Sequence, residues 1–175
     1  MTRIYGLIKS GVDMTHSVLL DTSFFIRLLN DEDTLHENAK GYFKYFLDND
    51  IVMNISTISI AEYCVLGRIA ELPLKNIFIV PFNLDHAEKA GDFASIIFSE
   101  KNISRESLLP RAIIPNDSKL FAQADVDNSI THFVTSDKRS QSTFRILKGK
   151  TNPKFEIIDI SVPHDQVFGI LDFKK

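Results

Sequence analysis

A short apolar run that ends at Asp21 and passes directly into a helical pattern constrains the fold of this chain most. Residues 18–20 are too few for a surface helix and are bounded by Asp-Thr-Ser, so we expect a buried strand. Apolar side chains then recur at helical spacing over residues 24–29. Such a junction places a carboxylate at the carboxyl end of a strand and beside a helix N-terminus, where open α/β sheets build ligand sites.

Strand-like and helix-like segments alternate along the rest of the chain. The apolar patterns predict further strands over residues 51–55, 77–80, 130–134 and 155–160. They predict helices over residues 34–47, 57–67, 83–98, 120–125 and 141–147, with a short closing helix after Pro163 and a loop over 101–115. Repeated βα units require right-handed crossovers and a mainly parallel sheet. We therefore predict an α/β fold, a three-layer α/β/α sandwich with helices on both faces of the sheet.

Length and composition indicate one ordinary domain. The 175 residues fit a single domain over residues 17–175, preceded by an N-terminal extension over residues 1–16. A net charge of −3 argues against a protein that grips nucleic acid with its whole surface. One cysteine excludes an intrachain disulfide, and we find neither a signal peptide nor a membrane span, so we expect a cytoplasmic location.

Four carboxylates stand at positions that favour a shared site. Asp21, Asp117 and Asp137 precede helices, where an aspartate can simply act as an N-cap worth about 1 kcal/mol. Capping does not explain Glu62, which falls on the apolar face of a helix and is expected to be largely buried. Capping also does not explain why Asp117 falls on the same predicted helix face as residues expected in the core. Cys64, on the same helix as Glu62, is expected to be a small core residue.

A cluster of these acids would need a counter-charge. If the strands before Asp21 and Asp137 are neighbours, the two carboxylates emerge on the same edge of the sheet, and we expect all four acids to converge there. Two such charges about 4 Å apart repel by roughly 4 kcal/mol at an effective dielectric constant near 20. Mg²⁺ or Mn²⁺ relieves this repulsion, because hard divalent cations prefer oxygen ligands and retain waters.

The ordered set of motifs resembles the PIN-domain nucleases. The matching segments are Leu20-Asp21-Thr22-Ser23, Ser59-Ile60-Ala61-Glu62, Asn116-Asp117-Ser118 and Val134-Thr135-Ser136-Asp137. The likeness covers about residues 17–160. It implies a metal-dependent endoribonuclease in which Asp21, Glu62, Asp117 and Asp137 bind Mg²⁺ or Mn²⁺. Many members of this family are toxins of toxin–antitoxin pairs, so the resemblance also implies an RNA substrate, a protein antitoxin and a homodimer.

Further residues are assigned around these acids. We expect the Ser23 and Thr135 hydroxyls to orient the carboxylates. Residues 138–155 carry six basic side chains and no acid, which is typical of a solvated helix face but also suits phosphate contact beside Asp137. Within this basic run, the candidates for RNA binding are Lys138, Arg139 and Arg145.

Four other interpretations compete with a nuclease. A phosphoaspartyl enzyme of the haloacid-dehalogenase type needs a second aspartate two residues after Asp21, where this chain has Ser23. The seven glycines do not cluster into a phosphate-binding loop, and the five histidines lack metal-ligand spacing. An RNA-binding or protein-interaction module of the same fold, with weak catalysis or none, stays open as the alternative function.

Overall fold

The computed structural model describes residues 17–100 and 115–169. The predicted extension over residues 1–16 and most of the predicted loop over 101–115 lie outside the described part. The strands are β1 (Ser17–Leu20), β2 (Val52–Ser56), β3 (Phe78–Val80), β4 (Ile130–Thr135) and β5 (Glu156–Asp159). The α-helices are α1 (Thr22–Leu28), α2 (His36–Asp48), α3 (Thr57–Tyr63), α4 (Leu84–Glu100), α5 (Asn116–Val126), α6 (Lys138–Lys150) and α7 (His164–Val167).

The five strands form one parallel sheet in the order β3-β2-β1-β4-β5. From β1 the chain builds outward through β2 and β3, then crosses to the other side of β1 for β4 and β5. β1 and β4 are therefore neighbours, and the direction of winding reverses between them. In open α/β sheets such a switch point leaves a crevice at the carboxyl ends of the two strands.

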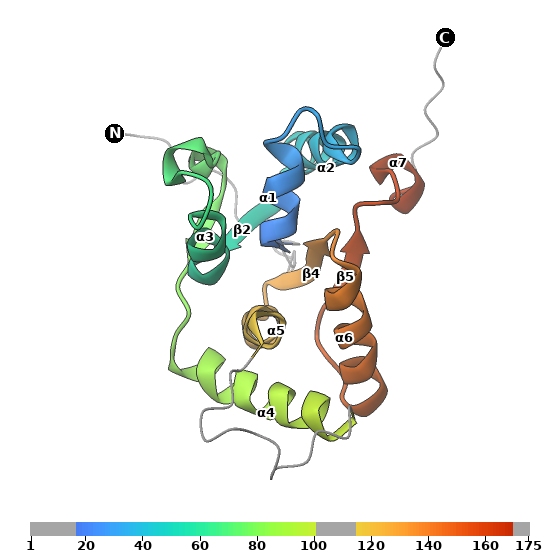
Figure 1. Ribbon diagram of the computed structural model, residues 1–175. Coiled ribbons are helices and arrows are strands. Elements are labelled where there is room, and N and C mark those ends of the chain that lie inside the picture. The colour runs from blue at the N-terminus through green and yellow to red at the C-terminus, as the bar shows by residue number, and fades with distance from the viewer. Residues whose placement is uncertain (1–16, 101–114, 170–175) are drawn as a thin grey trace, which may run out of the picture.

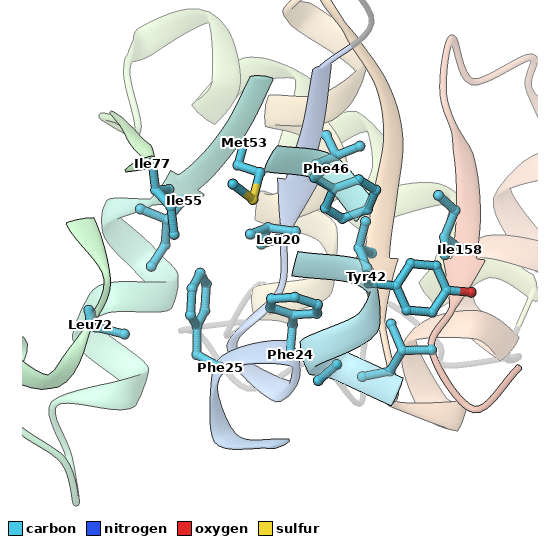
Figure 2. Packing of buried hydrophobic residues seen from close by; sticks show 14 residues of the cluster. Leu20, Phe24, Phe25, Tyr42, Phe46, Met53, Ile55, Leu72, Ile77 and Ile158 are labelled. Carbon is cyan, nitrogen blue, oxygen red and sulfur yellow. The ribbon is translucent and has the colours of Figure 1, made fainter. Parts of the chain in front are cut away.

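Helices cover both faces of the sheet, so the predicted three-layer α/β/α sandwich is confirmed (Figure 1). Successive residues of β1 point to opposite faces, which explains why the run is apolar throughout. Val18 and Leu20 pack with the aromatic side chains of α1 and α2 (Figure 2). Leu19 packs on the other face with residues of α4, α5 and α6.

Helix α2 begins later than expected. The spacing of Thr34 and Glu37 predicts a capping box at its start, and this prediction is wrong. The helix begins at His36, and its N-cap residue Leu35 makes no side-chain cap bond. Asp33 organises the preceding turn instead: one of its oxygens accepts a hydrogen bond from the Leu35 amide at 2.8 Å, and Arg27 pairs with the other. A salt-bridged aspartate has thus replaced the local cap.

Helix α3 is shorter than expected. It ends at Tyr63, not near Gly67, and the chain then turns, with the Gly67 amide donating to the Tyr63 carbonyl at 2.9 Å. A Cβ atom at Gly67 would lie 2.4 Å from the Tyr63 ring, so a larger residue here would force that ring to move. Because the helix stops here, Cys64 is exposed and Leu66 is 98% exposed. The prediction that Cys64 is a core residue is wrong.

Two other helices begin earlier than the apolar pattern indicated. α5 begins at Asn116, after Pro115, so Asp117 lies in the first turn and is not the cap residue. α6 begins at Lys138, and its N-cap is Asp137, whose side chain accepts from the Arg139 amide. Polar residues fill the first turn of α6, which is why hydrophobic periodicity missed its start. No helix within residues 17–100 or 115–169 is long and apolar enough to cross a membrane.

The core on the α4–α5–α6 face gives a direct test of this packing. Phe121 of α5 is fully buried and contacts the rings of Phe133, Phe144 and Phe155. We expect Phe121→Ala to lower the free energy of unfolding by about 3–5 kcal/mol, because it leaves a cavity among these rings. Urea denaturation followed by circular dichroism measures the change.

The control is Phe78→Ala on the edge strand β3, where the side chain is 66% exposed. This substitution should change the free energy of unfolding by less than about 1 kcal/mol. Equal losses for the two variants would contradict the proposed core.

Candidate functional site

The candidate site lies where β1 and β4 end side by side. Leu20 of β1 pairs with Val134 of β4, so the residues that follow each strand emerge together at one edge of the sheet. Asp21 directly follows β1, and Asp137 is the second residue after β4. The strands before Asp21 and Asp137 are therefore neighbours, which is the arrangement in which we expected the two acids to converge.

Asp21 is buried and held in a fixed orientation. Its side chain is the N-cap of α1, with Oδ1 accepting from the Thr22 amide at 2.8 Å. Oδ2 accepts from the Ser23 and Thr135 hydroxyls, both at 2.7 Å. The Ser23 and Thr135 hydroxyls, which we expected to orient the carboxylates, therefore both contact Asp21. Burial raises the pKa of Asp21, Asp117 raises it further, and the three hydrogen bonds oppose the rise.

The bonding of Asp21 also bears on the phosphoaspartyl interpretation. A carboxylate offers about four lone-pair positions, and three are occupied here by donors from the chain itself. A nucleophile needs an exposed oxygen, whereas Asp21 is 6% exposed and its carboxylate is bonded to residues of α1 and β4. The one remaining position, on Oδ1, suits a ligand better than a nucleophile.

Glu62 is half-buried, not largely buried as the helical periodicity predicted. The reason is the early end of α3, which removes the final turn that would have covered it. Its two oxygens accept hydrogen bonds from the Thr22 hydroxyl and from the Asn116 side-chain amide. Glu62 forms no ion pair with a lysine or arginine of the described residues, so its negative charge is left without a cationic partner there.

Asp117 projects from the first turn of α5 towards α6. Its Oδ1 accepts from the Ser140 hydroxyl at 2.6 Å. Burial raises the pKa of Asp117, and the neighbouring charges of Asp137 and Glu62 raise it further, while the Ser140 hydrogen bond and Arg139 oppose the rise. The charges of Asp137 and Glu62 therefore act on Asp117, as expected for members of one site.

Asp137 is the N-cap of α6, and it also lines the candidate site. Its Oδ1 accepts from the Arg139 amide at 2.8 Å, and Oδ2 lies 3.6 Å from the Arg139 guanidinium. The side chain is partly exposed. Capping and ligand binding are compatible here, because the cap uses one oxygen and leaves the other accessible.

All four acids line one hollow of about 290 Å³, which we call the acid hollow. It is lined by Asp21, Thr22, Ser23, Ile26, Glu62, Asp117, Leu120 and Asp137. No lysine or arginine stands among these described lining residues. Within residues 17–100 and 115–169, however, no three acid, histidine or cysteine side chains are gathered closely enough to enclose an ion. The acids share a cavity without forming a closed ligand shell.

The donor set of the acid hollow fits a hard divalent cation. All its charged groups are carboxylates, and the pKa values of Asp21 and Asp117 are raised by burial and by neighbouring carboxylates. Mg²⁺ commonly binds through one or two carboxylates and keeps several waters, so it does not need a closed protein shell. Asp21, Glu62, Asp117 and Asp137 are the residues that could hold such an ion, directly or through water.

Sequence reasoning missed three residues that contact the acids. Thr22 and Asn116 both donate to Glu62, and Ser140 donates to Asp117. Ser140 follows Asp137 by three residues on α6, so its helical spacing could have placed it on the same face. Thr22 and Asn116 adjoin candidate acids, but nothing in the sequence joins either of them to Glu62.

The basic run is largely neutralised by the chain itself. Lys138 pairs with Asp159 at 2.6 Å, Lys148 with Glu156 at 2.5 Å, and Lys150 with Glu100 at 2.9 Å. Of the three candidates for RNA binding, Arg139 lies beside the acids, and Arg145 is exposed without an ion pair to another described residue. Lys138 faces Asp159 instead.

Two larger cavities adjoin the acid hollow. A cavity of about 480 Å³, which we call the side pocket, shares Glu62, Asp117 and Asp137 with the hollow and extends along α6. An apolar groove of about 700 Å³ also includes Glu62, and its other lining residues include Ile26, Leu29, Tyr63, Val65 and Leu66. Glu62 is therefore the residue common to all three spaces.

Several solved structures share this architecture. VapBC2 from Rickettsia felis, bound to a DNA fragment from its promoter, matches with a TM-score of 0.56 and 18% identity, over 82% of this chain and 98% of that one. The fold is PIN-like. DNA-bound VapBC from Salmonella typhimurium matches with a TM-score of 0.52 and 16% identity, over 82% and 98% of the two chains.

FitAB bound to an IR36 DNA fragment gives the same TM-score of 0.52 at 16% identity, over 82% of this chain and 94% of that one. At these identities the PIN-like likeness concerns the fold. No protein-family model and no curated protein matches the sequence.

Metal binding to the PIN-like domain can be measured through stability. We expect millimolar Mn²⁺ to raise the melting temperature, because a ligand that binds the folded form at about 100 times its Kd adds about 2.7 kcal/mol. Asp21→Asn should remove most of this shift. The control Asp50→Asn should keep it, since Asp50 is exposed and has a φ of 55°, which asparagine tolerates.

The raised pKa values set the pH dependence of this shift. Asp21 and Asp117 bind protons more tightly in the folded state, so without metal their contribution to stability falls as the pH rises through their folded pKa values. The shift caused by Mn²⁺ should therefore shrink as the pH falls from neutral, because protons compete with the ion. A melting temperature that Mn²⁺ leaves unchanged at neutral pH would contradict the metal site.

Proposed function

We propose that this protein is a metal-dependent endoribonuclease that hydrolyses RNA phosphodiester bonds. The observation that carries the proposal is the acid hollow, in which four carboxylates lie together at the switch point of the sheet without a lining cation. A site of this charge repels an RNA phosphate unless a divalent ion stands between them. The ion implied by the oxygen donors is Mg²⁺ or Mn²⁺.

The roles of the individual residues follow from their contacts. Asp21, Glu62, Asp117 and Asp137 would hold the ion, which supplies a lower pKa for an attacking water and neutralises charge on the phosphoryl group. Ser23 and Thr135 keep the Asp21 oxygens aimed into the hollow, and Ser140 does the same for Asp117. Such fixed carboxylates lose little orientational freedom when they bind.

A protein antitoxin is the partner that we propose for the apolar groove. Ile26, Val65 and Leu66 are exposed there, and Glu62 links the groove to the acid hollow. The solved VapBC and FitAB structures are antitoxin complexes bound to DNA, which supports a partner of this kind. A chain seated in the groove would also restrict access to the acids. A homodimer and a cytoplasmic location complete the proposal as predictions.

A PIN-like module that binds RNA or protein without catalysis is the second candidate. It is favoured by the open arrangement of the acids, of which no three among the described residues enclose an ion. The presence of all four carboxylates favours the nuclease. One experiment separates the two candidates.

That experiment compares cleavage of total cellular RNA by the wild type and by Asp21→Asn, with Mg²⁺ or Mn²⁺ present. We expect Asp21→Asn to reduce the rate by at least about 100-fold, because it removes a buried ligand charge. Asp50→Asn should cleave at the wild-type rate. Equal cleavage by the wild type and Asp21→Asn would indicate another site or a contaminant, and no cleavage by any protein would favour the binding module.

The basic candidates are tested through the salt dependence of RNA binding. Replacing both Arg139 and Arg145 by alanine should weaken binding and reduce the slope of log K against log salt by about 1.4, at roughly 0.7 per contact on single strands. The control is Lys148→Ala, since Lys148 pairs with Glu156. If the double variant and the control give the same slope, the basic run makes no phosphate contact.

A further inference from the structure

We infer that the side pocket binds one unpaired nucleoside of the RNA, adjacent to the phosphate that is cut. This inference rests on the proposed function and adds the position of one part of the substrate. The side pocket shares Glu62, Asp117 and Asp137 with the acid hollow, so a phosphate at the acids and a nucleoside in the pocket would be covalent neighbours. Its volume of about 480 Å³ falls within the range of small-ligand sites.

Part of the side pocket lining is apolar, and we call this part its apolar wall. Ile97 of α4 and Ile146 of α6 line it together with Pro115, which precedes α5. These side chains offer flat aliphatic surface against which a base face can pack, releasing water from both. A phosphate or a free ion would gain nothing from this wall, so the lining favours a group with an apolar face.

The polar side of the pocket offers one uncommitted hydroxyl. Asn116 is occupied, because it donates to Glu62 and accepts from Lys119 at 3.1 Å, and the Ser142 hydroxyl donates to the Lys138 carbonyl at 2.9 Å. The Thr143 hydroxyl, on a residue that is 7% exposed, has no hydrogen-bond partner among the residues that the structure describes. A hydroxyl can donate or accept, so Thr143 suits the edge of a base.

Charge places the nucleoside relative to the backbone. Arg139 lines the side pocket and lies 3.6 Å from Asp137, at the boundary between the pocket and the acids. A guanidinium there would meet a backbone phosphate as the strand passes from one space to the other. The pocket itself therefore receives the sugar and base, and the charged groups at its rim receive the backbone.

This geometry selects unpaired RNA. A base that enters a pocket beside its own phosphate must leave the helical stack and give up its pairing partner. Unpaired loops and single strands present their bases at no such cost, whereas a duplex would lose several kcal/mol of pairing and stacking. The side pocket therefore predicts cleavage in loops or single strands next to one preferred nucleoside.

The test measures binding of RNA oligonucleotides to the wild-type protein by fluorescence anisotropy, with Ca²⁺ in place of Mn²⁺ and with gels that confirm that the RNA stays intact. One series of oligonucleotides has an abasic ribose at each position in turn. We expect one abasic position, next to the cleavage site of the wild type, to weaken binding by about tenfold or more. Thr143→Val, added to the same protein, should weaken binding of the intact RNA about 3- to 10-fold and leave binding of that abasic RNA unchanged.

Two further variants complete the test. Ile146→Ala should weaken the intact RNA and spare the abasic RNA as well, since it removes part of the apolar wall. Thr131→Val is the matched control, because Thr131 lies near the start of β4 and bonds the Ser17 carbonyl at the far end of the sheet. It should leave binding of both RNAs unchanged.

The outcomes separate the two proposals. Equal binding of every abasic RNA, or equal weakening of intact and abasic RNA by Thr143→Val, would overturn the nucleoside pocket even if the wild type cleaves RNA. If the wild type and Asp21→Asn cleave equally while one abasic position still weakens binding, the pocket stands and the catalytic proposal fails.

Discussion

The structure depends on the pairing of β1 with β4, because that pairing buries a carboxylate between two strand ends. Asp21 sits where the two strands finish, and hydroxyls from both sides, Ser23 and Thr135, donate to it. The same hydroxyls accept from the Ser136 and Asp137 amides at 3.0 Å. The carboxylate, the helix N-terminus and the β4–α6 turn therefore form one hydrogen-bonded unit. Loss of any member would leave buried polar groups unsatisfied.

Electrostatics turn this unit from a structural feature into a candidate site. Elsewhere in the described chain, three buried or partly buried acids have cationic partners: Asp125 pairs with Lys89, Asp33 with Arg27, and Asp159 with Lys138. In the acid hollow the four carboxylates share one cavity, and burial together with the charge of neighbouring carboxylates raises the pKa values of Asp21 and Asp117. Charge that is left uncompensated in one place is costly for folding and useful for binding an ion.

The spaces around Glu62 divide the surface by chemistry. The apolar groove on one side suits a protein chain, the acid hollow suits a cation, and the side pocket combines apolar surface with a free hydroxyl. A partner in the groove and RNA in the pocket would meet at Glu62, so occupation of one could limit access to the other. The short α3 makes this possible, because a longer helix would have covered Glu62 with its final turn.

The sequence by itself determined the layered architecture and the candidate acids. Apolar runs too short for helices became parallel strands, and each of the four acids lines the acid hollow. Local patterns failed at two helix ends, where a contact between residues a few positions apart changed the structure: Arg27 pairs with Asp33 in the turn before α2, and Gly67 lies against the Tyr63 ring after α3. Only the tertiary structure decided that Glu62 is half-exposed, that Lys138 faces Asp159, and that Thr22, Asn116 and Ser140 hold the acids. Hydrophobic periodicity reports which face of an element is buried, but the partner of a polar side chain depends on how separate elements are brought together in space.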